Sequence, residues 1–173
     1  MATDVITGWR GARAAATGAF LAHGLVSSAW VARIPQIKED LGLTEGSLGL
    51  ALLGSPVGVV VAVRFAGRIV ARWSSRTATR VAGVLAGLSL VPLGLAWNLG
   101  SLVVALALFG AALGIMDVAM NAQGVAVERR RGRPLMSGLH GAWSVGALAG
   151  ALAGSAAAHL EVPVAVHLGV TGV

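Results

Sequence analysis

The stretch LVVALALFGAALGIMDVAMNAQGVAV, residues 102–127, decides the fold. It contains a single charged side chain, Asp117, and the basic segment ERRRGR follows it at residues 128–133. An α-helix rises 1.5 Å per residue, so about 20 apolar residues cross the roughly 30 Å hydrocarbon layer of a bilayer. The sequence therefore predicts a transmembrane helix that ends in a basic loop.

The composition of the whole chain agrees with this prediction. Of the 173 residues, 56% are hydrophobic and only 12% are charged, and the mean hydropathy is +0.81. A soluble domain carries about 25% charged residues. The chain also has 25 glycines, and small residues allow membrane helices to pack closely. The fold class that we predict is an all-α membrane protein, not a soluble enzyme.

Further apolar stretches accompany the first one. We predict a single transmembrane domain over residues 1–173, with spans at about 14–31, 47–63, 81–97, 102–127, 135–158 and 162–173. The first five are long enough to cross a bilayer. The last has about 12 residues, so we expect an incomplete sixth helix, as in a fragment of a longer protein.

The basic residues concentrate in alternate connections between these spans. If every span crosses, eleven of the 13 lysines and arginines lie on one side of the membrane: Arg10, Arg13, Arg64, Arg68, Arg72, Arg76, Arg80, Arg129, Arg130, Arg131 and Arg133. The positive-inside rule then predicts a multi-pass protein of the cell membrane with a cytoplasmic N-terminus. The net charge of +6 follows from these loops, and we expect no nucleic-acid partner because no soluble docking module is present.

Polar side chains lie on one face of three of the spans. His23 and Ser27 are four residues apart on the first, Asp117 and Asn121 four apart on the fourth, and His140 lies on the fifth. Because polar groups are expensive in hydrocarbon, such faces point inward toward a polar cavity or toward other helices. We predict that these residues line a solute pathway, and helix-to-helix hydrogen bonding by the same groups is the alternative.

Asp117 is the one carboxylate well inside a predicted span. The charged form of a carboxylate is costly in hydrocarbon, so such a group can take up and release a proton. We therefore predict a proton-coupling site at Asp117. A structural aspartate near the cytoplasmic end, paired with an arginine or capping polar groups, remains the alternative. Gln123 lies off this face, and we expect it to bond a neighbouring helix.

Two further patterns have structural interpretations. Gly146, Gly150 and Gly154 recur every four residues, which predicts a close helix contact. Trp30 and Arg33, at the outer end of the first span, are expected to anchor it at the membrane interface.

Motifs for catalysis or cofactor binding are missing from the sequence. GxGxxG and P-loop patterns are absent, there is no cysteine, and His159 and His167 are too widely spaced for one helical face. We therefore predict no enzyme activity, no metal site and no cofactor.

The segment Gly67-Arg-Ile-Val-Ala71-Arg72-Trp-Ser74-Ser75-Arg76 resembles the signature of major facilitator superfamily transporters, in the loop after their second helix. Gly67, Arg72 and Arg76 match this gating-loop signature. Ala71 replaces its acid and Ser74 its glycine. The acid helps to latch the family's cytoplasmic gate, so the resemblance implies a latch without that group here.

Two other stretches carry the same resemblance. Residues 32–43 are similar to the family's first outer loop, and residues 117–124 with 137–146 look like the subgroup of fucose-type permeases. The resemblance covers nearly the whole chain and implies the N-terminal half of a two-half carrier, whose first and fourth helices line the central path. In fucose-type symporters a carboxylate on the fourth helix couples protons, and Asp117 falls in a similar place.

The function predicted from the sequence is alternating-access transport of a small polar solute, with proton-coupled symport as the leading mechanism. The expected partners are the solute, protons, the lipid bilayer and a C-terminal six-helix half that this chain lacks. Efflux of amphipathic compounds is one alternative. A non-transporting membrane scaffold or sensor, or an inactive transporter fragment, is the other.

Overall fold

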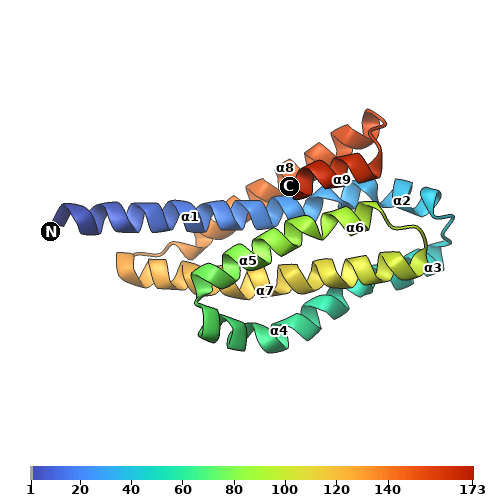
Figure 1. Cartoon of the computed structure of the whole chain (residues 1–173). Helices are drawn as coiled ribbons and strands as arrows, with labels where there is room; N and C mark the ends of the chain where they lie inside the picture. Colours follow the sequence, from blue (N-terminus) through green and yellow to red (C-terminus); the bar gives the residue numbers. More distant parts are fainter. Residues whose placement is uncertain (1) are drawn as a thin grey trace.

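The protein is a bundle of helices in which consecutive membrane-spanning segments run in opposite directions (Figure 1). The computed structural model describes the backbone of residues 2–173 and the side chains of residues 10–173, and this part of the chain contains no strand. Its elements are α1 (Ala2–Ala29), the 3₁₀ turn η1 (Val31–Arg33), α2 (Ile34–Asp40), α3 (Glu45–Leu52), α4 (Gly54–Trp73), α5 (Ser75–Leu88), α6 (Leu90–Gly94), α7 (Leu99–Arg131), α8 (Met136–His159) and α9 (Val164–Gly172). The all-α prediction is confirmed.

Five helical segments of the described chain are long and apolar enough to cross a membrane. They cover residues 10–40, 45–73, 75–94, 99–131 and 136–159. Three of these segments consist of two helices separated by a short break: α1 and α2, α3 and α4, and α5 and α6. The helix α9 has nine residues and is about 14 Å long, which is less than half of the hydrocarbon layer.

The arginine-rich connections lie at one end of the bundle, which we call the arginine end. The start of α1, the turn from α4 to α5 and the turn from α7 to α8 meet there (Figure 1). The helix α7 stops at this end because Gly132, with φ +68°, adopts the left-handed conformation after three arginines. At the other end Asn98 caps α7, and its side chain and that of Ser101 accept hydrogen bonds from each other's backbone N–H.

The helices α1 and α8 pack through glycines. A Cβ added at Gly146 would lie 2.0 Å from the carbonyl oxygen of Leu21, and one added at Gly150 would lie 2.3 Å from that of Leu25. Gly154 approaches Ala29 in the same way. The predicted close contact through this glycine stripe is therefore confirmed, and its partner is α1.

A second glycine contact joins α4 to α7. A Cβ at Gly58 would lie 2.0 Å from the carbonyl oxygen of Ala107, and one at Gly110 would lie 2.1 Å from that of Ser55. Gly110 shares a helical face with Asp117, but at this level of α7 the face packs on α4 instead of lining a cavity. The open part of the face therefore begins closer to the arginine end.

The prediction that Trp30 and Arg33 are interface anchors is wrong. Arg33 is 0% exposed and Trp30 only 8%, because the α8–α9 connection and α7 cover them. The guanidinium of Arg33 donates to the carbonyl oxygen of Val162, and the indole of Trp30 packs edge-on against Phe109, with ring centroids 6.1 Å apart. These side chains therefore tie helices together inside the protein.

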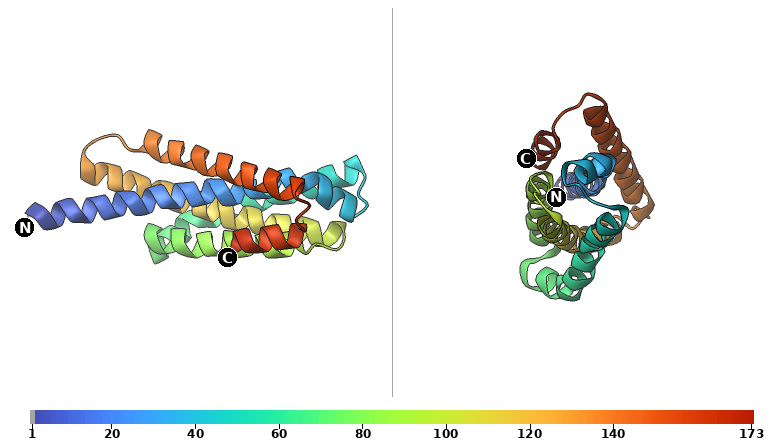
Figure 2. Two further views of the ribbon diagram at one scale, coloured as in Figure 1. Left: turned by 90° about the horizontal axis from the view of Figure 1, so that it is seen from above. Right: turned by 90° about the vertical axis from the view of Figure 1, so that its right-hand side faces the viewer.

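The outward surface of the bundle is apolar, as a lipid-facing surface must be. Large exposed hydrophobic side chains occur along α4, α7 and α8, among them Val60, Leu108 and Leu152. Figure 2 shows the same bundle from above and end-on, with α1 between α8 and α5. This arrangement places α1, α7 and α8 around one hollow. The polar residues predicted to line a pathway lie on these three helices.

Candidate functional site

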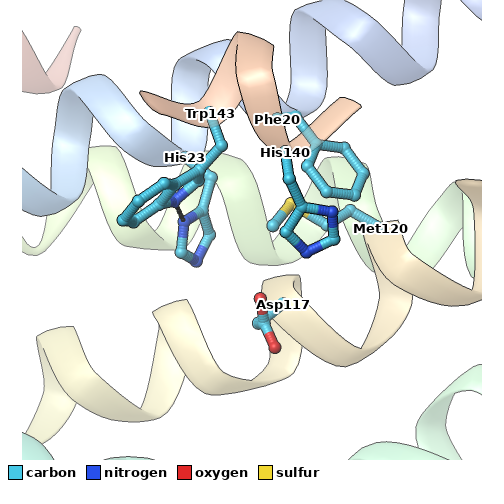
Figure 3. A pocket seen from close by; sticks show the side chains of 6 residues that line it. All are labelled: Phe20, His23, Asp117, Met120, His140 and Trp143. Carbon is cyan, nitrogen blue, oxygen red and sulfur yellow. Dashed lines mark hydrogen bonds between the residues drawn. The ribbon is translucent and has the colours of Figure 1, made fainter. Parts of the chain in front are cut away.

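A hollow of about 210 Å³ lies between α1, α7 and α8, on a face of the bundle where Asp117, His140 and Trp143 are exposed (Figure 3). Six side chains line it: Phe20, His23, Asp117, Met120, His140 and Trp143. Asp117 lies about 27 Å along α7 from its first residue and about 21 Å from its last. The hollow therefore lies near the middle of the length of α7, away from the arginine end.

His23 ties three helices together. The indole Nε1–H of Trp143 on α8 donates to Nδ1 of His23 over 2.9 Å, and Nε2 of His23 lies 3.3 Å from the carbonyl oxygen of Leu113 on α7. A carbonyl oxygen only accepts, so Nε2 bears the hydrogen and Nδ1 does not. His23 is therefore held as the neutral Nε2–H tautomer, with both ring nitrogens engaged.

Asp117 points from α7 toward the rings of His23 and His140 (Figure 3). Asn121, one turn further along α7, donates from Nδ2 to the Asp117 backbone carbonyl at 2.8 Å and to its carboxylate Oδ1 at 3.2 Å. Among the side chains that the structure describes, no lysine or arginine forms an ion pair with Asp117. The structure thus supplies no partner for the alternative in which an arginine neutralises this carboxylate.

His140 faces the hollow from α8. Its Nδ1 lies 3.1 Å from the carbonyl oxygen of Met136, so Nδ1 bears a hydrogen. The ring packs against Phe20 with centroids 5.2 Å apart at 62°. In the neutral ring, Nε2 therefore remains as an acceptor toward the hollow.

The structure brings together three of the five residues predicted for the pathway and proton site: His23, Asp117 and His140. Asn121 contacts the site through Asp117. Ser27 is not in the lining, and its hydroxyl donates to the carbonyl oxygen of Gly24 within α1. That these residues contact a solute remains a prediction.

Gln123 accepts a hydrogen bond from Ser75 of α5 at 2.6 Å, which confirms its expected interhelical role.

Trp143, Phe20 and Met120 were not among the predicted site residues. Trp143 follows His140 by three residues and so shares its helical face, which is the one signal in the sequence that includes it. Phe20 and Met120 are indistinguishable in the sequence from other buried apolar residues.

The gating-loop residues lie at the arginine end. Gly67 is within α4, Arg72 is in its last turn, and Arg76 is at the start of α5. Ser74, between the helices, has φ +71° and ψ 153°, a conformation that is nearly restricted to glycine. Glycine adopts this conformation without a Cβ clash, so Ser74 bears a backbone strain that a glycine at this position of the signature would avoid.

A second hollow, of about 650 Å³, opens at the arginine end between α1, α5 and α7. Arg76, Arg80 and Arg130 lie at its wall, together with small residues of α1. This hollow is larger than the first, but none of the described residues that line it has a carboxylate, and it lies at the end of the bundle. We therefore take the hollow between α1, α7 and α8 as the candidate site.

Comparison with known proteins gives a consistent family assignment. The family model described as Major Facilitator Superfamily matches residues 15–172. The chain is 43% identical over 133 residues to an uncharacterized MFS-type transporter of Yersinia pestis. The aligned residues make up 77% of the chain and 35% of that protein. No solved structure matches the chain significantly.

Two rhizobial proteins are also similar to the chain. An uncharacterized transporter of Sinorhizobium fredii is 38% identical over 172 residues, 98% of the chain and 44% of that protein. The membrane protein MosC of Rhizobium meliloti is 35% identical over 131 residues, 76% of the chain and 32% of that protein. The chain thus spans less than half the length of these relatives. The narrower likeness to fucose-type permeases stays a prediction.

Proposed function

Because this chain belongs to the major facilitator superfamily, we propose that it forms one half of a membrane carrier that moves a small polar solute by alternating access, coupled to protons at Asp117. The observation that carries this proposal is the hollow between α1, α7 and α8, whose single carboxylate has no cationic partner among the described residues. An arginine partner would make Asp117 a structural group. A carboxylate that lies on an open face without a cationic partner can instead bind a proton or a ligand.

A carrier of this kind needs a second half around the same site. The relatives are more than twice as long as the segments that align with this chain. We propose that a second six-helix half closes over the exposed face on which Asp117 lies. The arginine end would then be cytoplasmic in the cell membrane, by the positive-inside rule.

The mechanism that the sequence favours is symport. A second candidate is exchange of a proton for an amphipathic compound, which the indole of Trp143 and the thioether of Met120 in the lining support. In symport a proton gradient directed into a vesicle drives the solute in. In exchange the same gradient drives it out.

The proposal is tested with the complete transporter in sealed vesicles, by measuring movement of a panel of small polar solutes with and without an imposed pH gradient. We expect at least one solute to accumulate or to be extruded only when the gradient is present. Movement that is identical with and without the gradient, or equal to that in vesicles without protein, would remove the proton-coupled carrier function.

A further inference from the structure

Every side-chain N–H at the candidate site is already engaged within the protein. The indole of Trp143 donates to His23, His23 donates to Leu113, and the Nδ1–H of His140 donates to Met136. Asn121, beside the site, donates to Asp117. The other three lining residues, Phe20, Met120 and Asp117, have no side-chain N–H. The protein therefore offers a ligand no free N–H donor from the lining.

What remains available to a ligand is a set of acceptors. The Asp117 carboxylate accepts one side-chain hydrogen bond, from Asn121 at Oδ1, so most of its acceptor capacity remains for the hollow. Nε2 of the neutral His140 ring is a second acceptor. A ligand that matches this site must therefore bring donors.

The electrostatics of the lining select the charge of that ligand. Asp117 carries the single formal charge of the lining when both histidines are neutral. Within a membrane an uncompensated carboxylate is costly, and a cation that enters the hollow removes this cost. An anion would be repelled, and a neutral polyol would leave the charge uncompensated.

The remaining surfaces of the hollow suit the apolar part of an organic cation. The ring of Trp143 is about one-third exposed, and indole is the best aromatic partner for a cation. Phe20 and Met120 form a buried apolar floor. The volume of about 210 Å³ is small, which limits the part of the ligand held by this half to about a single ring.

We propose that the hollow between α1, α7 and α8 binds a small organic ammonium, a primary or secondary amine in its cationic form, whose N–H groups donate to Asp117 and to Nε2 of His140. This inference rests on the proposed function in that it places the solute at the same hollow. It also selects between the two mechanisms. A proton and an ammonium compensate the same carboxylate and exclude each other, so their coupling is exchange and not symport.

The test measures binding alone, so it does not depend on transport. The full chain in lipid nanodiscs is titrated by calorimetry with three probes of nearly equal size: cyclohexylammonium, cyclohexanol and cyclohexanecarboxylate. Empty nanodiscs correct for partition into lipid. We expect saturable binding of cyclohexylammonium, and binding of the alcohol and of the carboxylate that is weaker by about tenfold or more, because the charge-assisted hydrogen bonds are missing.

Variants assign the binding to the hollow. Asp117→Asn should weaken cyclohexylammonium binding by about 10- to 100-fold, since it removes the charge but keeps the shape. Glu39→Gln removes a carboxylate from exposed α2 and should leave the affinity unchanged, while Asp117→Glu should keep the preference for the cation. Circular dichroism and gel filtration confirm that each variant is folded.

Binding of the alcohol or the carboxylate equal to that of the ammonium would overturn the inference, as would undiminished ammonium binding in folded Asp117→Asn. Either result leaves proton-coupled transport of a neutral solute intact. Conversely, ammonium binding that depends on Asp117, in a protein whose transport ignores the pH gradient, would support this inference and remove the proposed proton coupling.

Discussion

Replacing Asp117 with Asn should abolish the proton-driven solute movement that we propose for the complete transporter. Asparagine has the same shape but cannot exchange a proton, and no other described residue that lines the hollow has a carboxylate. The vesicles should therefore reach only equal solute concentrations on the two sides, with or without a pH gradient. The measurement is the steady-state ratio of solute inside to outside at a fixed gradient.

The matched control for this prediction is Glu39→Gln, which makes the same chemical change on exposed α2. It should reach the wild-type concentration ratio. If Asp117→Asn sustains the wild-type ratio, the proton site lies elsewhere and the alternative of a structural aspartate is correct.

Replacing Gly146 with Leu prevents stable folding. A Cβ at this position would lie 2.0 Å from the carbonyl oxygen of Leu21. The helices α1 and α8, which form the most extensive helix contact among the described residues, would therefore have to separate. Over-packing a tight site costs about 1–3 kcal/mol and sometimes more, and here the blocking atom is backbone and cannot turn aside. We expect a loss of at least about 3 kcal/mol, seen as aggregation or a large fall in unfolding temperature in detergent.

Gly141→Leu is the control for this effect. Gly141 lies on the same helix, and a Cβ added there meets no atom within 4 Å. The two substitutions change helix propensity equally, so the difference between them isolates the contact with α1. Equal stability of the two variants would contradict the packing described for this helix pair.

Much of the fold could be predicted from the sequence because the bilayer imposes simple rules. Apolar length predicts the spanning helices, and the arginines predict which connections lie together. The spacing of Gly146, Gly150 and Gly154 indicated a close contact, although it could not name α1 as the partner. These signals are local, which is why one sequence is enough to detect them.

The wrong prediction and the missed residues concern contacts between residues far apart in the chain. Arg33 was expected at the membrane interface, but its acceptor is the carbonyl oxygen of Val162, 129 residues away. Trp143 bonds His23 across 120 residues. Helical periodicity shows which face a side chain occupies, but it does not show which helix lies opposite. For the same reason Gly110, which packs on α4, could not be separated from Asp117, which faces the hollow.

The central claim is that the Asp117 carboxylate in the hollow between α1, α7 and α8 exchanges a proton. Infrared difference spectroscopy on the chain in nanodiscs tests this claim directly, by recording the protonated-carboxyl stretching band as the pH is lowered. We predict that the wild-type band contains a component from Asp117, which is absent from the spectrum of Asp117→Asn. The Glu39→Gln variant should lose only the contribution of Glu39 and keep the Asp117 component. If the spectra of the wild type and of Asp117→Asn are the same over the whole pH range, the claim is contradicted.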